Sequence, residues 1–177
     1  MFYPVSLPRA LAAAAAAIAL ILLFSGTAAS SSCQIPKEPI KWSAAIESGG
    51  KPLKAGERFA LQLTARIEEG WHLYSTHQVE GGPIPTRIAL PADQPFEMAG
   101  TIESSEPETA FDPNFNLMTE FYENEASFAV PVRVTAVAAP GKAEVRVTVS
   151  FQTCNDEVCL PPRTVRLTVP LELSVGK

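Results

Sequence analysis

Strict alternation of apolar and polar residues in four segments is the feature that most limits the fold of this chain. The apolar positions with this spacing are Phe59, Leu61, Leu63, Ala65 and Ile67; Phe128, Val130, Val132 and Val134; Val145, Val147, Val149 and Phe151; and Val165, Leu167, Val169, Leu171 and Leu173. Because successive side chains of a β-strand point to opposite faces, the spacing predicts strands with one buried face. No segment after residue 29 has a sustained helical period, so we expect an all-β protein.

Shorter runs and turn residues divide the rest of the chain. Further strands are predicted at 41–46, 71–75 and 87–90. Residues that favour turns stand between strands at Gly49-Gly50, Gly81-Gly82-Pro83, Asp112-Pro113-Asn114 and Pro140-Gly141. Seven or so short strands predict a single immunoglobulin-like antiparallel β-sandwich over residues 39–175. The weakly patterned segment 93–120 predicts a long loop over its surface.

The N-terminus has the features of a secretory signal. Arg9 precedes an uncharged apolar run at 10–24, and small residues follow at 25–29. The run is shorter than the roughly 20 residues that cross a bilayer. We therefore predict a cleaved signal peptide at 1–29, followed by a flexible segment at 30–38 and export from the cytoplasm. Cys33 is then either a lipid-bearing first residue, as in bacterial lipoproteins, or a free thiol.

The charge balance excludes one class of partner. The chain has 14 basic and 19 acidic residues, which gives a net charge of −5. Nucleic acid requires a basic surface, so we do not expect this chain to bind it. After residue 29 no apolar stretch is long enough to span a membrane.

Cys154 and Cys159 are the best candidates for chemistry. Residues 155–158 form a short connection between them, so the two sulfurs are expected across the mouth of a hairpin. Continuing the alternation of the preceding strand predicts that Cys154 points toward solvent. A disulfide closing so small a ring stabilises by about 2 kcal/mol. The spacing alone leaves open a structural disulfide, an exchanging pair and a metal site.

A zinc site would combine these cysteines with His72 and His77, the two histidines of the chain. In an extended strand the two histidines fall on opposite faces, which argues against such a site. His72 is then expected as a polar residue on the exposed face of a strand. We expect neither a metal nor a cofactor.

Three segments carry a resemblance to a known family. They are the cysteine pair followed by Leu160-Pro161-Pro162, the segment Gly70-Trp71-His72-Leu73-Tyr74, and Glu120-Phe121-Tyr122. Together they resemble the N-terminal periplasmic domain of the thiol:disulfide interchange protein DsbD. The resemblance implies an immunoglobulin-like sandwich in the periplasm. It also implies electron transfer from a thioredoxin-like domain, recharged through a membrane domain, to disulfide isomerases and cytochrome c maturation factors.

The resemblance also implies roles for single residues. Cys159 would form mixed disulfides with partners, and Cys154 would resolve them. Phe121 would be the cap-loop aromatic that shields the cysteines, with Tyr122 beside it, and Tyr74 would line the site.

Some positions depart from the family pattern. His72 stands where relatives often have tyrosine, and Thr119, beside Glu120, replaces an acidic residue. The cysteine spacing is one residue shorter than in the best-known member. His72 and Glu120 are therefore candidate site residues whose roles the resemblance does not assign.

Two functions follow as hypotheses. The first is a protein-disulfide reductase component, acting as a monomer with thioredoxin-like periplasmic proteins and a membrane electron-transfer protein. The second is a secreted binding module with a structural disulfide, in which Phe121 and Trp71 form a binding patch. Because Asp156 and Glu157 lie between the cysteines and disfavour a thiolate, we expect the pair to react slowly until a partner docks.

Overall fold

The computed structural model describes residues 38–46 and 50–175. The predicted signal peptide at 1–29, Cys33 and all but the last residue of the predicted flexible segment 30–38 lie outside the described residues. Every regular element within the described ranges is a β-strand. The described residues contain no helix that is long and apolar enough to cross a membrane.

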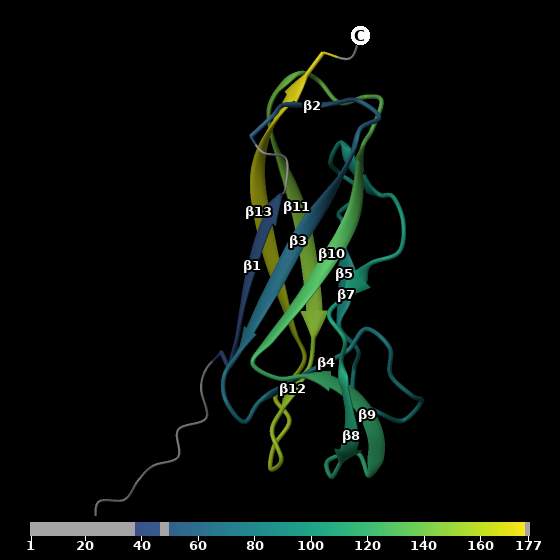
Figure 1. Ribbon diagram of the computed structural model, residues 1–177, viewed down its shortest axis with the longest axis vertical. Coiled ribbons are helices and arrows are strands. Elements are labelled where there is room, and N and C mark those ends of the chain that lie inside the picture. The colour runs from purple at the N-terminus through teal and green to yellow at the C-terminus, as the bar shows by residue number, and fades with distance from the viewer. Residues whose placement is uncertain (1–37, 47–49, 176–177) are drawn as a thin grey trace, which may run out of the picture. The chain divides into compact units, whose positions relative to one another are not determined.

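The strands of the described ranges form three sheets (Figure 1). Sheet A contains β1 (Ile40–Ile46), β3 (Arg58–Ile67), β10 (Glu125–Val134), β6 (Phe96–Met98) and β7 (Glu103–Ser104). Sheet B contains β2 (Leu53–Lys54), β13 (Arg163–Ser174), β11 (Gly141–Phe151) and β5 (Arg87–Ala89). Sheet C contains β12 (Thr153–Cys154), β4 (His72–Tyr74), β9 (Leu117–Tyr122) and β8 (Glu108–Asp112). All these pairings are antiparallel except that of β2 with β13.

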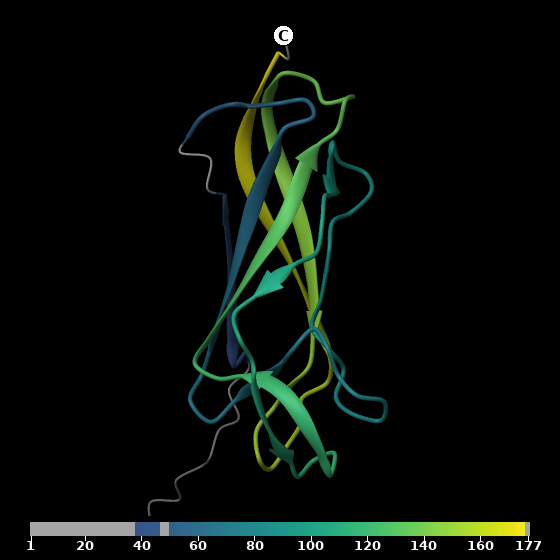
Figure 2. The same ribbon diagram turned by 45° about the vertical axis from the view of Figure 1, so that its right-hand side comes forward.

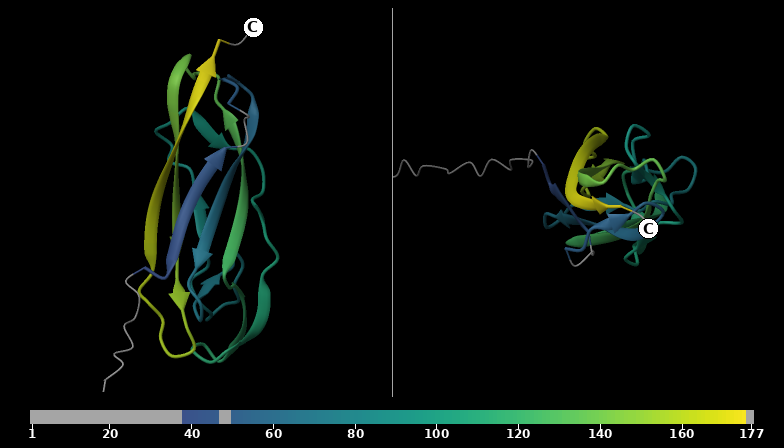
Figure 3. Two further views of the ribbon diagram at one scale, coloured as in Figure 1. Left: turned by 60° about the vertical axis from the view of Figure 1, so that its left-hand side comes forward. Right: turned by 90° about the horizontal axis from the view of Figure 1, so that it is seen from above.

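Sheets A and B form the two layers of a sandwich, which Figure 2 and Figure 3 show from other sides. Leu61 and Leu63 of β3, Val130 of β10, and Val147 and Val149 of β11 are fully buried in one apolar cluster between the layers. Burial of a side chain of this size stabilises a fold by about 1.5–3 kcal/mol. The predicted immunoglobulin-like antiparallel sandwich is confirmed, and so are the four long alternating strands.

The shorter predicted strands are also present, as β1, β4 and β5. The prediction of a long loop at 93–120 is wrong, because this segment contains β6, β7, β8 and the start of β9. Strands β6 and β7 each pair with only two or three residues along one edge of β10. Strands as short as β6 and β7 leave too few positions for an alternating pattern to be visible in the sequence.

Sheet C lies at the end of the sandwich that is opposite β2 (Figure 1). The chain passes from β11 of sheet B to β12 of sheet C at Gln152, since Phe151 still pairs with Arg163 of β13 while Thr153 pairs with Leu73 of β4. Earlier in the chain, β9 of sheet C is joined to β10 of sheet A by a tight turn in which Asn124 has a φ of 61°. Asparagine tolerates this left-handed conformation better than most residues. Sheet C is the part of the fold that carries the cysteines.

Candidate functional site

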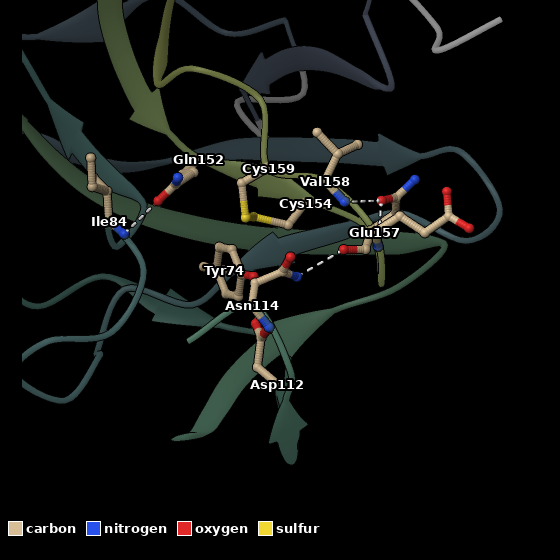
Figure 4. Close-up of a disulfide and its surroundings, with 10 residues drawn as sticks. Tyr74, Ile84, Asp112, Asn114, Gln152, Cys154, Glu157, Val158 and Cys159 are labelled. Carbon is tan, nitrogen blue, oxygen red and sulfur yellow. Dashed lines mark hydrogen bonds between the residues drawn. A yellow bond between two sulfur atoms is a disulfide. The ribbon is translucent and has the colours of Figure 1, made fainter. Parts of the chain in front are cut away.

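Cys154 and Cys159 form a disulfide that closes a short loop at residues 155–158 (Figure 4). Their Cα atoms are 4.0 Å apart, and the two residues form an antiparallel bridge. The backbone N–H of Leu160 donates to the carbonyl of Thr153 at 2.9 Å, just outside the ring. The predicted hairpin with a sulfur on each side of its mouth is confirmed.

The loop at 155–158 is braced by its first residue. The Asn155 side-chain Oδ1 accepts hydrogen bonds from the backbone N–H of Glu157 at 3.0 Å and of Val158 at 2.7 Å. The Asn155 backbone N–H donates to the Val158 carbonyl at 2.9 Å. An asparagine in this role replaces backbone hydrogen bonds that so short a turn cannot make. Asp156 and Glu157 are exposed at the tip.

The predicted position of Cys154 near solvent is wrong. Its side chain has no exposed surface. The alternation continues where the chain passes from sheet B to sheet C at Gln152, since Phe151 and Thr153 are both buried and Cys154 lies on the opposite face with its register partner His72. Cys154 is buried because Tyr74 and Phe121 cover the face on which it lies.

Three aromatic rings pack with the cysteines in a small cluster separate from the main core. Its buried members are Tyr74, Phe121 and Cys154, and the partly buried Phe115, Ala110 and Cys159 pack against them. We call Tyr74, Phe115 and Phe121 the aromatic cover. Tyr74 and Phe115 meet edge to face, with ring centroids 5.9 Å apart. The two cysteines therefore differ in exposure, since Cys154 is fully buried and Cys159 is partly exposed.

His72 is part of this site, and its predicted place on an exposed strand face is wrong. Its side chain is 16% exposed. The imidazole ring stacks on Phe121 with centroids 4.3 Å apart, and its Nε2 lies 2.9 Å from Glu123 Oε1. His72 is also the register partner of Cys154. Stacking against Phe121 explains why a polar side chain is covered here.

Tyr74 connects the aromatic cover to a buried carboxylate. Its hydroxyl donates a hydrogen bond to Asp112 Oδ2 at 2.5 Å, and Asp112 itself is 4% exposed. Burial raises the pKa of Tyr74 far above its ordinary value, and the hydrogen bond and the charge of Asp112 raise this pKa further. Tyr74 therefore keeps its proton at physiological pH.

The structure does not bring Tyr122 and Glu120 to the disulfide. Tyr122 belongs to the main core, where its ring meets Phe128 edge to face at 5.6 Å. The side chain of Glu120 accepts a hydrogen bond from the Ser75 hydroxyl at 3.0 Å. Both residues alternate with Phe121 along β9, so they point away from the face that Phe121 uses.

Trp71 and Phe121 do not form the surface patch proposed for a binding module. Trp71 is 5% exposed and lies in the main core, whereas Phe121 is 6% exposed and lies in the disulfide cluster. The two side chains are thus buried in separate places.

A groove of about 210 Å³ lies beside the disulfide loop and borders the aromatic cover. The residues that line it are His72, Ala110, Phe111, Asp112, Pro113, Phe121, Glu123 and Asp156. Within the described ranges, no group of three or more His, Cys, Asp or Glu side chains is placed to hold a metal ion. The chemistry that this arrangement offers is that of its two sulfurs.

Asp112, Asn114 and Phe115 belong to the site but were not predicted as site residues. The sequence showed Asp112-Pro113-Asn114 only as a turn. The available signal was Phe115, a large aromatic inside a polar turn, because an aromatic residue in such a place often packs against a neighbouring element.

A family model described as "Thiol:disulfide interchange protein DsbD, N-terminal" matches residues 48–170. Among solved structures, the reduced N-terminal domain of DsbD from Neisseria meningitidis is similar at 19% identity, over 64% of this chain and 78% of that chain, with a TM-score of 0.46. The N-terminal periplasmic domain of ScsB from Proteus mirabilis is similar at 16% identity, with a TM-score of 0.49. That similarity covers 79% of this chain and 49% of the ScsB chain, so this chain matches about half of that domain. A search of curated proteins found no match.

Proposed function

This chain belongs to the family of the N-terminal domain of the thiol:disulfide interchange protein DsbD, and from that membership we propose that it relays reducing equivalents to oxidised periplasmic proteins. The working group is the pair Cys154 and Cys159, which is present here as a disulfide. As a thiol:disulfide interchange module, the domain would be reduced by one partner and would then reduce another.

The observation that carries this proposal is the unequal exposure of the two cysteines. Exchange requires a thiolate and a sulfur that the partner can reach. Cys159 is partly exposed, whereas Cys154 is fully buried beneath Phe121 and Tyr74. Cys159 is therefore the sulfur proposed to contact partners, and Cys154 is the one proposed to resolve them.

Reduction of a partner proceeds in two displacements. In the first, the thiolate of Cys159 attacks one sulfur of the partner's disulfide, which forms a mixed disulfide and releases the partner's other sulfur as a thiolate. In the second, the thiolate of Cys154 attacks the Sγ of Cys159, which restores the Cys154–Cys159 bond and releases the partner's second thiolate. Two electrons pass to the partner, and its two thiolates take up protons from water. The reverse sequence with a reduced donor recharges the domain.

The aromatic cover limits which proteins react. Phe121 stacks on His72 and packs in the same cluster as the two cysteines. We therefore infer that a partner must move this ring before its own sulfur reaches Cys159 in line with the disulfide. We assign Phe121 and Tyr74 to covering the pair, and His72 to holding Phe121 in place. Glu120 and Tyr122 are assigned to holding β9 from its other face.

The partners are proposed from family membership. The donor is a thioredoxin-like domain or a membrane electron carrier, and the recipients are thioredoxin-like periplasmic proteins such as disulfide isomerases or cytochrome c maturation factors. The domain is proposed to act as a monomer after export through a cleaved signal peptide. Lipid attachment at Cys33 is compatible with the same role at a membrane surface.

Trapping of partners tests the proposal. In a Cys33→Ser background, Cys154→Ser leaves Cys159 unable to be released from a mixed disulfide. Expressed in the periplasm of a bacterium, this variant should accumulate disulfide-linked complexes with thioredoxin-like proteins, which reductant dissolves. The matched control is Cys159→Ser, which should trap little because Cys154 is buried. Equal trapping by the two variants would refute the proposed division of roles, and no trapping by either would refute the relay.

A further inference from the structure

A chain of hydrogen bonds connects Tyr74 to the disulfide loop through Asp112, the last residue of β8, and Asn114 in the β8–β9 turn. Figure 4 shows these residues beside the loop. The Tyr74 hydroxyl donates to Asp112 Oδ2 at 2.5 Å, and the backbone N–H of Asn114 donates to Asp112 Oδ1 at 2.9 Å. The Asn114 side-chain Nδ2 then donates to the Asn155 carbonyl at 2.9 Å. The contacts join β4, the β8–β9 turn and the loop between the cysteines.

Asp112 is an unusual residue to find so deeply buried. Burying an ionised carboxylate away from water costs free energy unless hydrogen bonds satisfy its oxygens. Apolar groups in place of a buried carboxylate and its hydrogen-bond partner often give a fold of equal stability. Among the described residues, no ion pair of Asp112 is seen, and its two oxygens each accept one of the hydrogen bonds above. The carboxylate thus fixes the Asn114 backbone relative to the Tyr74 ring.

Asn114 is the point at which this arrangement reaches the disulfide. The loop at 155–158 is held internally by Asn155, but that bracing does not attach it to the rest of the site. The Asn114–Asn155 hydrogen bond does, since it holds the carbonyl of the residue directly after Cys154. Neither this contact nor the backbone hydrogen bond between Leu160 and Thr153 involves a sulfur atom, so reduction of the disulfide does not itself break them.

We propose that Asn114, oriented by Asp112, is a positioning residue for thiol–disulfide exchange that holds the Cys154–Cys159 loop in its closed geometry in the reduced protein. The inference rests on the proposed function, because it concerns the equilibrium of the same pair. Two thiols that are held close have a high effective concentration, which favours the disulfide over the dithiol. Loss of the anchor lets the reduced loop open and makes the disulfide easier to reduce.

The test is the equilibrium of the pair with glutathione, measured on the Cys33→Ser protein, which requires no partner. Asn114→Ala is expected to lower the equilibrium constant for disulfide formation about tenfold, which corresponds to a potential about 30 mV higher. Asn114→Asp places an acceptor opposite the Asn155 carbonyl and should lower the constant at least as much. The matched control is Asn116→Gly, since Asn116 is exposed in the same turn with a φ of 55° that glycine adopts freely. It should leave the constant unchanged.

Asp112 is tested by a double-mutant cycle. Asp112→Ala should shift the constant in the same direction, and the Asp112→Ala/Asn114→Ala double variant should add little to Asn114→Ala. Since Asn114 is exposed, its variants are expected to fold, which circular dichroism checks. An unchanged constant in folded Asn114→Ala, or a shift of equal size in Asn116→Gly, overturns the inference. Failure of partner trapping with a shifted constant in Asn114→Ala would instead refute the relay and leave the positioning role standing.

Discussion

His72 and Phe121 stack face to face with ring centroids 4.3 Å apart, and the same imidazole lies 2.9 Å from the carboxylate of Glu123. His72 is paired in register with Cys154, so the strand that borders the buried sulfur also holds the ring that covers it. The cover over the disulfide is therefore fixed by a side-chain contact on the adjacent strand.

Removal of the Phe121 ring should speed thiol–disulfide exchange at the Cys154–Cys159 pair. Phe121→Ala eliminates the stack on His72, which is worth about 1 kcal/mol and corresponds to about fivefold in a rate or equilibrium. We expect glutathione to reduce the disulfide of this variant at least about fivefold faster than that of the unaltered protein. The appearance of free thiol measures the rate.

The matched control is Phe111→Ala, which removes the same side chain from β8, where it is 57% exposed. Its reduction rate should equal that of the unaltered protein. Equal acceleration in both variants would mean that general loosening of sheet C, and not the loss of the cover, controls access.

The reduced protein should react slowly with an alkylating reagent near neutral pH. The exposed Asp156 and Glu157 lie between the cysteines, and negative charge nearby disfavours the thiolate that reacts. Because solvent screens exposed charges, replacing both with Asp156→Asn and Glu157→Gln should speed labelling of Cys159 only about two- to threefold. Mass spectrometry of the labelled protein over a range of pH checks this. Labelling of Cys159 as fast as that of a thioredoxin thiol would contradict the expectation.

The strands could be predicted from the sequence because a strand with one buried face has an apolar residue at every second position. Leu61, Leu63 and Val147 are fully buried as their alternation indicated. The same rule failed for Cys154, because alternation tells which face of the strand a residue lies on but not what covers that face, and Tyr74 and Phe121 bury this residue. No residue pattern around Cys154 shows this cover, because it comes from β4 and β9.

The site was predictable only in part, and for a different reason. Phe121 and Tyr74 were expected near the cysteines from the resemblance of their segments, and both lie in the disulfide cluster. Asp112 and Asn114 carry no such signal, because turns commonly contain these residues for their own backbone hydrogen bonds. Their role appears only when the β8–β9 turn is placed against the loop at 155–158, which is a contact between distant parts of the chain.

Tyr74 should make the stability of the domain depend on pH in the alkaline range. Burial, together with Asp112, raises its pKa in the folded protein above the value in the unfolded chain. The resulting stabilisation is complete below the ordinary tyrosine pKa of about 10 and is lost as the pH rises above it. Each such tyrosine lowers the free energy of unfolding by up to about 1.4 kcal/mol per pH unit in that window.

Urea unfolding at a series of alkaline pH values measures this slope. Tyr74→Phe should make the dependence of the free energy of unfolding on pH shallower. Burial also raises the pKa of Tyr122, so this tyrosine should still contribute to the slope that is left. An identical slope in Tyr74→Phe and in the unaltered protein would show that Tyr74 does not hold its proton as described.

Reduction of the disulfide should leave the domain folded. The ring closed by Cys154 and Cys159 is short, so the bond is expected to contribute only about 2 kcal/mol by constraining the unfolded chain. The free energy of unfolding, measured in urea with and without a reductant, should differ by about that amount. Loss of the folded state on reduction would show that the bond is needed as a structural brace, which a relay that cycles between both forms cannot tolerate.

The potential of the Cys154–Cys159 pair separates a relay from a structural disulfide. Structural disulfides of exported proteins commonly have potentials below about −300 mV, where glutathione does not reduce them. The small stabilisation from so short a ring and the partial exposure of Cys159 both favour a bond that exchanges. We therefore expect equilibration with glutathione at a potential above about −300 mV in the Cys33→Ser protein. A value well below it would assign the bond to holding the hairpin, and the carrier function would then have to be abandoned even if Cys159 reacts with partners when Cys154 is removed.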